Sequence, residues 1–592
     1  MRTRARRSAV ALLGAGALSL AAACGGSSGG SPSSQGSSAP AGAHMGGTLK
    51  LVGVSDIDGT DPAAWYFTTD YEIANLIARQ LLTYPRDPST GKFGTTPVGD
   101  AADLPKISSD GKTYTFTIKQ GVKWDTTPAR QVTAADFARG LARTCNPVKA
   151  FGASSYLTST IVGFKKFCDG ELKIGTSAAA LKNYINAHLS EVSGIQASGE
   201  TLTFHLIQPA SDFNNILALP FASAVPVEYM KYAPNSAALG QHYISDGPYK
   251  VDKYVPGKSW TFSRNPAWER STDPNRPSYV DNIDITTGLT QQAVQQQIQA
   301  GTADMEFDTF PLPSQVPQLN RVHDPNLRID PTSSNNPYVV FNTVSPNNNG
   351  ALSKIPVRQA LEYAADTAHM LQVCGGPLTN NPIHQVLPAD IAGSSPAYNL
   401  YPYDPNKAKS MLQAAGATNL TLKVLYANTS TCATSAAQVL QSDFKKVGVH
   451  VTLVPAPIAD VYGKYLEVQP SVTQKGNWDL AFAGWGADWE GNSARTYFQP
   501  LFDGRVFAPS SSNFGDFKDV KVDNLIDQAL AAPSVSQATS IWHQADVQVM
   551  KDAVWIPFTN PKQANYFNSS KLANFIYFTN YQNGDWTSVY FK

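Results

Sequence analysis

The chain from about Gly46 to Lys592 is the feature that most limits the possible folds, because it is too long for one hydrophobic core. This length predicts two or three domains. With 42% hydrophobic residues, the composition is that of an ordinary globular protein. We find no tandem repeat and no apolar run beyond the N-terminus that is long enough for a transmembrane helix.

Local patterns predict both strands and helices. Apolar residues alternate with polar ones in two segments that each follow a turn: Tyr114, Phe116 and Ile118, and Leu202, Phe204 and Leu206. Helical spacing predicts helices over Pro356–Asp366 and Asp404–Ala415, the second with Asp404 as N-cap and Gly416 after its end. The mixture predicts an α/β or α+β fold.

The N-terminus has the order of a secretory signal. Arg2, Arg4, Arg6 and Arg7 precede an uncharged run over residues 8–23, which ends in three alanines before Cys24. These small residues are similar to the bacterial lipobox, in which the cysteine thiol takes a diacylglyceryl group; Ala21 stands where leucine is more usual. An ordinary cleavable signal with an unrelated cysteine is the alternative. Arg6-Arg7 leaves twin-arginine export open beside the general route.

Residues 24–45 are expected to form a disordered tether after a signal peptide over residues 1–23. From Gly25 to Gly47 the chain has no Lys, Arg, Asp or Glu, and such a composition cannot bury enough apolar surface to fold. About 20 residues of this kind give a root-mean-square reach on the order of 25 Å. That reach would let a globular body dock on a partner in the same membrane.

Charge argues against nucleic acid as a partner. The full sequence has 46 basic and 46 acidic residues, and removal of four leader arginines leaves 42 against 46, a net charge of −4.

The remaining cysteines predict two disulfides. An exported chain with an even number of cysteines generally pairs them, and four cysteines allow three connectivities. We favour the adjacent pairing, and the sequence leaves the other two open. The cysteines are Cys145, Cys168, Cys374 and Cys432.

Motifs for enzymatic chemistry are missing from the sequence, so we expect neither catalysis nor a cofactor. There is no GxSxG elbow, HExxH helix, CxxC pair or Walker-type loop. Asp56, Asp58 and Asp61 resemble a calcium loop, but the later ligands are absent and an ordinary turn is the better interpretation. The nine histidines have no paired ligand spacing, so no metal site is predicted, although His384 or His450 could approach a cleft.

Short motifs along most of the chain carry a family resemblance. The central one runs from Thr115 to Asp136, and the others lie before and after it: Gly46-Gly47-Thr48-Leu49, Asp58 with Asp61-Pro62, Asp246-Gly247-Pro248-Tyr249-Lys250, Val357-Arg358-Gln359-Ala360-Leu361, Tyr403-Asp404-Pro405 with Lys407-Ala408, Lys446-Val447-Gly448-Val449, Trp485-Gly486-Ala487-Asp488-Trp489 and Trp555-Ile556-Pro557. In order and spacing the set resembles extracellular solute-binding protein family 5, the peptide-type binding lipoproteins of ABC importers. Thr126-Thr127-Pro128 departs from the family's more usual Asp-Gly-Thr-Pro.

The resemblance implies a two-lobed, type II periplasmic-binding-protein-like fold with an extra domain inserted in the first lobe. Two chain crossings between the lobes would form a hinge, expected near Phe310–Pro317 and Trp555–Asn560. The implied ranges are 46–85, 221–316 and 556–592 for lobe 1, 86–220 for the extra domain and 317–555 for lobe 2.

The resemblance also implies ligand-binding residues. In oligopeptide-binding relatives the segment matching Trp485–Asp488 sets its Asp against the ligand's α-ammonium, and a carboxylate in a closing cleft needs such a cation. An Asp that caps a turn or pairs with Arg495 is the alternative. Trp485 and Trp489 could line the cleft or belong to the core. Phe341 and Asn342 match positions that bring backbone groups to the ligand.

The function implied is a lipid-anchored receptor on the extracytoplasmic face of the membrane. It would bind short peptides and deliver them, as a monomer, to ABC permease subunits that work with separate ATPase subunits. Binding of oligosaccharides of the cello-oligosaccharide type is the alternative, since 10 Trp and 25 Tyr offer stacking faces. Nickel or metal chelates rank lower, and an extracytoplasmic hydrolase lowest.

Overall fold

The computed structural model describes residues 44–148, 154–309, 311–312, 314–395, 398–467, 470–505, 512–579 and 582–592. The expected signal peptide, the lipidation site Cys24 and nearly all of the tether lie outside these residues, as does Phe310 of the first expected hinge. Strands and helices are mixed along the described chain, which confirms the α/β prediction.

A five-stranded sheet, here called the first sheet, has the strand order β12-β13-β14-β1-β15. β1 pairs in parallel with β14 and β15, whereas β13 pairs antiparallel with both β12 and β14. Alternate apolar residues of β1 and β14 are buried in one core with helix α1. The bounds are β1 Thr48–Val52, β12 Tyr249–Val255, β13 Ser259–Arg264, β14 Asn282–Thr286, β15 Met305–Glu306 and α1 Thr68–Ile77.

A second five-stranded sheet has the order β20-β19-β21-β17-β22. β19 runs parallel to β20 and β21, and β17 runs antiparallel to β21 and β22. The bounds are β17 Ser334–Phe341, β19 Thr421–Ala427, β20 His450–Ala456, β21 Leu480–Gly486 and β22 Trp555–Ile556.

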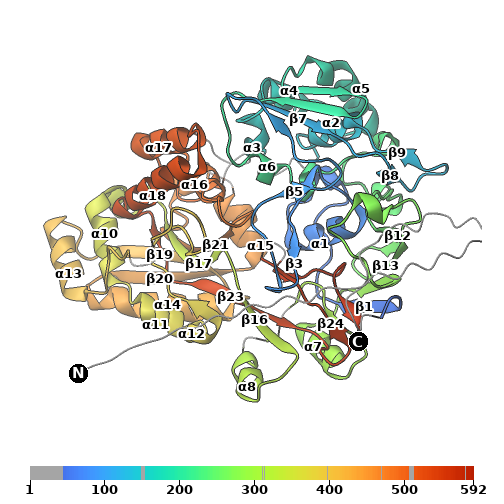
Figure 1. Ribbon diagram of the computed structural model, residues 1–592. Helices are drawn as coiled ribbons and strands as arrows, with labels where there is room; N and C mark the ends of the chain where they lie inside the picture. Colours follow the sequence, from blue (N-terminus) through green and yellow to red (C-terminus); the bar gives the residue numbers. More distant parts are fainter. Residues whose placement is uncertain are drawn as a thin grey trace, which may run out of the picture. The chain divides into compact units, whose positions relative to one another are not determined.

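Helices cover both faces of the second sheet (Figure 1). Successive residues of β17 therefore enter different cores, with Tyr338 and Val340 in one and Val339 and Phe341 in the other. This explains why β17 and β21 contain continuous apolar runs rather than alternating ones. The covering helices are α10 Ile355–Ala364, α13 Pro405–Ala414 and α14 Thr431–Lys446 on one face, and α16 Arg495–Phe502, α17 Val520–Leu530 and α18 Val535–Lys551 on the other.

An antiparallel sheet of four strands, β10-β11-β7-β6, comes between β1 and β12 of the first sheet in the sequence. Tyr114, Phe116, Leu202 and Phe204 are buried, so the alternation in the sequence identified both central strands correctly. The bounds are β6 Lys106–Ile107, β7 Thr113–Thr117, β10 Ile195–Ser198 and β11 Thr201–His205, with helices α2 Ala134–Arg143, α4 Phe164–Glu171 and α5 Ala178–His188.

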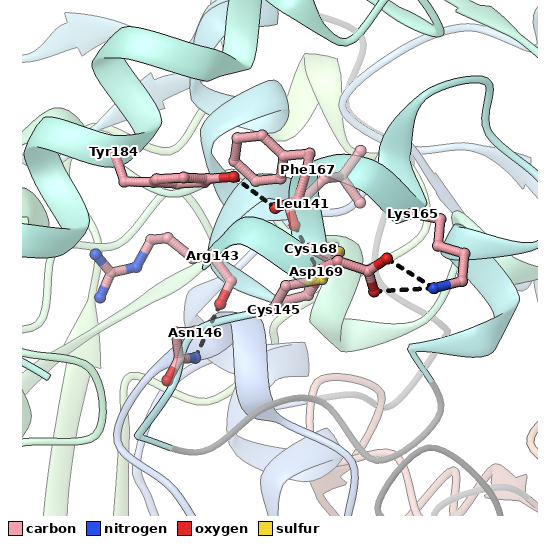
Figure 2. Close-up of a disulfide and its surroundings, with 10 residues drawn as sticks. Leu141, Arg143, Cys145, Asn146, Lys165, Phe167, Cys168, Asp169 and Tyr184 are labelled. Atoms are coloured by element: carbon pink, nitrogen blue, oxygen red, sulfur yellow. Dashed lines mark hydrogen bonds and ion pairs between the residues drawn. A yellow bond between two sulfur atoms is a disulfide. The ribbon is translucent and has the colours of Figure 1, made fainter. Parts of the chain in front are cut away.

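Each of two disulfides joins a cysteine within one helix to a cysteine that follows another helix. Figure 2 shows Cys145, just after α2, bonded to Cys168 of α4. Their Cα atoms are 5.1 Å apart. Cys374 follows helix α11 (Thr367–Val373) and is bonded to Cys432 of α14, with a Cα–Cα distance of 4.5 Å. Both bonds follow the adjacent pairing that the sequence favoured.

The predicted helices form close to their expected limits. α10 spans Ile355–Ala364 and α13 spans Pro405–Ala414. The Asp404 carboxylate caps α13 by accepting a hydrogen bond of 2.9 Å from the backbone N–H of Lys407. Gly416 follows with a φ of 64°, a left-handed conformation that favours glycine after a helix.

The chain enters and leaves the second sheet through a three-stranded sheet of order β16-β23-β18, in which β18 is Asn380–Asn381. β16 Leu327–Pro331 pairs antiparallel with β23 Asn560–Tyr566. The passages into and out of the second sheet therefore lie between β16 and β17 and between β22 and β23. The expected hinge range 555–560 includes the second of these connections, and helix α8 (Val316–Arg321) begins within the other expected range, 310–317.

Candidate functional site

The segment after β21 brings Asp488 into contact with two distant parts of the chain. Its carboxylate oxygen Oδ2 accepts hydrogen bonds from the Tyr66 hydroxyl at 2.8 Å and the Tyr156 hydroxyl at 2.5 Å. Tyr66 lies just before α1 and Tyr156 lies in helix α3 (Ser155–Thr158), and both side chains pack in or against the core of the four-stranded sheet. Asp488 therefore lies where the end of the second sheet meets that core.

Burial controls the protonation of this cluster. It raises the pKa of Asp488 to about 6, and the two tyrosine hydrogen bonds only partly offset that rise. Burial, followed by the nearby Asp488 charge, raises the pKa of Tyr66 and Tyr156 well above the usual tyrosine value. Both hydroxyls consequently stay protonated as donors, and the Asp488 carboxylate is mostly ionised at neutral pH.

A buried ion pair crosses the same interface. The Arg495 guanidinium lies 3.1 Å from the Asp212 carboxylate and donates to the Thr160 hydroxyl at 2.9 Å. Its planar group also lies over the Tyr156 ring, 5.4 Å from the centroid. Arg495 thus pairs with Asp212, not with Asp488 as the alternative interpretation of the sequence supposed.

The two tryptophans of the motif have different surroundings. Trp489 is fully buried among core residues of the four-stranded sheet, and its ring meets that of Tyr156 edge-on at 5.7 Å. Trp485 is half-buried in β21 of the second sheet, and its indole N–H donates to the Thr496 carbonyl at 2.8 Å. Trp489 is therefore part of the packing that holds the interface together.

Phe341 and Asn342 lie far from Asp488. In the antiparallel register of β17 and β21, Phe341 is opposite Leu480, whereas Ser334 is opposite Gly486. Seven residues of strand separate the two ends, roughly 23 Å at about 3.3 Å per residue. Asn342 is buried and its amide donates to the Thr473 and Trp478 carbonyls. The β17 residues that do lie beside the Trp485–Asp488 segment are at its beginning.

Ser333, just before β17, connects several of these groups. Its carbonyl accepts from the Ala487 N–H at 2.8 Å and from the Tyr497 hydroxyl at 3.0 Å, and its hydroxyl donates to Asp390. The sequence analysis missed Ser333, Asp390, Tyr66 and Tyr156. Tyr66 follows the Asp61-Pro62 motif closely, which could have drawn attention to it, but nothing local distinguishes Tyr156.

Several buried polar atoms near the segment have no hydrogen-bond partner in the described part of the chain. They are Asn335 Oδ1, Ser493 Oγ and the Tyr577 hydroxyl oxygen. Buried polar atoms normally find a partner. A bound polar ligand could therefore form hydrogen bonds with these unsatisfied groups next to a partly buried carboxylate.

The other candidates from the sequence lie in ordinary structural settings. Asp56 accepts hydrogen bonds from Tyr254 and Trp260, and Asp61 pairs with Arg143, consistent with a turn and not a calcium loop. His384 borders a pocket of about 90 Å³, and burial lowers its pKa.

Among the described residues, no group of three or more His, Cys, Asp or Glu is arranged to hold a metal ion. None of the described helices combines the length and apolar character needed to cross a membrane.

Comparison with known proteins gives consistent matches. The family described as "Bacterial extracellular solute-binding proteins, family 5 Middle" matches residues 96–507. Di/tripeptide-binding protein 4 of Pseudomonas aeruginosa is 27% identical over 80% of this chain and 83% of its own length. Heme-binding protein A of Haemophilus influenzae is 25% identical over 79% of each chain.

The fold also matches solved structures. The structure of clavulanic acid biosynthesis oligopeptide binding protein 2 has a TM-score of 0.78 at 23% identity, and the match covers 93% of this chain and 96% of that one. This likeness assigns the two-lobed α/β fold. The chain belongs to the bacterial extracellular solute-binding proteins of family 5.

Proposed function

We propose that the mature protein is the membrane-tethered binding component of an ABC importer, which binds a short peptide between its lobes and delivers it to the permease. The observation that carries this proposal is the partly buried Asp488 carboxylate, ionised at neutral pH, which accepts hydrogen bonds from two distant parts of the chain. The named di/tripeptide-binding relative supports the same ligand class. Lipid on Cys24 would hold the protein on the extracytoplasmic face as a monomer, and separate ATPase subunits would drive transport.

In this proposal Asp488 binds the α-ammonium of the peptide. An ionised carboxylate in a water-poor interface gains most from a cation that also donates hydrogen bonds. Tyr66 and Tyr156 hold the carboxylate in position from the opposite side of the interface. Extended chain near the end of β21 can bind the ligand backbone as an added strand, and water can fill the space around varied side chains.

A double-mutant cycle tests the proposal with trialanine and N-acetyl-trialanine as probes in calorimetry. Asp488→Asn keeps the shape and removes the charge, and loss of one side of a buried charge pair costs about 2–5 kcal/mol, or roughly 30-fold to several thousand-fold in affinity. Acetylation should weaken wild-type binding similarly. The two changes together should be far from additive, because both remove the same interaction.

Asp460→Asn is the matched control, because Asp460 forms a surface pair with Lys464. It should leave trialanine binding unchanged. Additive losses in the Asp488 cycle would exclude a contact with the ammonium. Equal binding of cello-oligosaccharides by wild type and Asp488→Asn would favour the sugar alternative, binding of a nickel chelate would favour a metal carrier, and turnover of peptides or esters would indicate a hydrolase.

A further inference from the structure

Two further carboxylates lie side by side next to Asp488. Ile391 and Gly491 form a parallel β-bridge, and the Ala392 N–H donates to the Gly491 carbonyl at 2.9 Å. Asp390 and Glu490 are the residues immediately before this bridge on its two strands. The bridge therefore holds two acidic side chains at neighbouring positions.

Hydroxyl groups are the hydrogen-bond partners of both carboxylates. Ser333 donates to Asp390, and Thr579 hydrogen-bonds to Glu490. Lys92 is the cation whose charge acts on both carboxylates, yet in the described part of the chain it forms no salt bridge with either. Two neighbouring carboxylates are thus left with hydroxyl donors and one more distant cation.

Burial of the carboxyl groups raises the pKa of both residues, although Asp390 as a residue remains exposed to solvent. The Asp390 charge also raises the pKa of Glu490, as expected for like charges at close range, and the Lys92 charge lowers the pKa of both residues. A ligand cation would relieve both the desolvation and the mutual repulsion. The exposed side of Asp390 leaves a route by which such a cation can arrive.

A buried hydroxyl provides independent evidence that something polar is missing beside the pair. Tyr577 is fully buried and its hydroxyl has no hydrogen-bond partner in the described residues. Burial, and then the charges of Asp330 and Glu490, raise the pKa of Tyr577 well above its usual value, so its hydroxyl lies close to the pair. Tyr577 is opposite Lys92 in the parallel pairing of two short strands. The first lobe therefore supplies this side of the interface.

We propose that Asp390 and Glu490 form a second cation-binding subsite, which takes the guanidinium or ammonium of a basic side chain. The preferred ligands would then be short peptides that carry an Arg or Lys in addition to a free α-ammonium. This inference rests on the proposed peptide-binding function. Arginine fits best, because its planar group can contact both carboxylates and still donate to a hydroxyl.

Ser333 links the subsite to the segment that carries Asp488. The Ser333 carbonyl holds Ala487, the neighbour of Asp488, and the Ser333 hydroxyl holds Asp390. Burial, followed by the charges of Asp390 and Asp488, raises the pKa of Tyr497, which places both carboxylates near one hydroxyl. The basic residue is consequently expected near the N-terminus of the peptide.

Calorimetry with six tripeptides tests the inference. Arg-Ala-Ala, Ala-Arg-Ala and Ala-Ala-Arg are compared with the same peptides carrying citrulline, which keeps the shape of arginine and lacks its charge. We expect the arginine peptide to bind at least tenfold more tightly than its citrulline partner at one of the first two positions. In the double variant Asp390→Asn/Glu490→Gln this preference should fall to less than threefold, with the citrulline affinities nearly unchanged.

Asp460→Asn is again the control and should keep the full preference. Circular dichroism and the melting temperature establish that each variant is folded, and the single variants Asp390→Asn and Glu490→Gln replace the double variant if it does not fold. Equal affinity for arginine and citrulline peptides at every position would overturn the subsite and leave the proposed function standing. Failure of all six peptides to bind would overturn both.

A measurement with metal salts tests the remaining explanation, that the carboxylate pair binds a metal ion. Calcium or magnesium chloride alone should not raise the melting temperature of the wild type. A rise that the double variant abolishes would identify the carboxylate pair as a metal site and overturn the assignment to a basic side chain.

Discussion

The guanidinium of Arg495 lies 3.1 Å from the carboxylate of Asp212, and both side chains are almost completely buried. Arg495 begins α16 on the second sheet, whereas Asp212 follows the four-stranded sheet and precedes helix α6 (Phe213–Ile216). The pair can form only while these two regions touch. It therefore contributes to the contact between these two regions.

Arg495→Met should weaken closure. The substitution leaves Asp212 buried without its charge partner, which typically costs about 2–5 kcal/mol in the closed state. Trialanine affinity should fall by roughly 30-fold or more, and the ligand-dependent decrease in radius of gyration in small-angle scattering should become smaller. Lys165→Met, which breaks the exposed Lys165–Asp169 pair, is the control and should change neither quantity. Unchanged affinity and compaction in Arg495→Met would mean that the pair has no part in closure.

Ligand affinity should depend on pH through Asp488. Its pKa of about 6 means that the carboxylate loses its charge as pH falls through that value. At pH 5 about one tenth of the groups remain ionised, so binding of a ligand ammonium should weaken by about tenfold relative to pH 7. Calorimetry with trialanine at pH 5, 6 and 7 measures this. The Asp488→Asn variant should show a flat profile, and a slope as steep as that of wild type would contradict the assignment.

Global stability should fall with rising pH because of Glu306. Burial raises the pKa of Glu306 from 4.5 to about 8, so between these values the native state keeps a proton that the unfolded chain releases. The stabilisation is complete below pH 4.5 and is lost as pH rises toward 8, with a slope of at most about 1.4 kcal/mol per pH unit. Urea unfolding at pH 5 to 8 measures it. Glu306→Gln should flatten this slope, and Glu191→Gln at an exposed site should not.

The two disulfides should contribute unequally to stability. In the chain-entropy description, closing the 58-residue separation of Cys374 and Cys432 stabilises by about 4 kcal/mol, and closing the 23-residue separation of Cys145 and Cys168 by about 3 kcal/mol. Replacing each pair by alanine and comparing urea midpoints tests the order. A larger loss for the shorter loop would show that local packing outweighs chain entropy.

Membrane attachment should depend on Cys24, a residue outside those that the structure describes. Cys24→Ala should release the protein from washed membranes, because the following Gly/Ser tract has no apolar segment to replace the two acyl chains of a diacylglyceryl group. Fractionation and intact mass measure the effect. A variant that stays in the membrane, together with a wild type that lacks lipid mass, would refute the lipoprotein prediction.

The sequence predicted strands and helices correctly where the interactions that determine them lie within a few residues. The strand containing Tyr114 and Phe116 and the helix capped by Asp404 follow from alternation and capping over a few residues, and both are confirmed. The family motifs directed attention to Asp488 and its neighbours. The same reasoning grouped Phe341 and Asn342 with that site, and the register of β17 against β21 separates them by the length of a strand.

The sequence by itself thus determined the α/β class, the family and one acidic residue at the interface, because these are encoded in short-range patterns and in the order of motifs. Only the tertiary structure decided what surrounds that residue. Tyr66 and Tyr156 are 422 and 332 residues away from Asp488 along the chain, and Asp390 and Glu490 become neighbours through a single bridge. Such contacts depend on how separately folded layers pack, and packing of this kind leaves no periodic signal in the sequence.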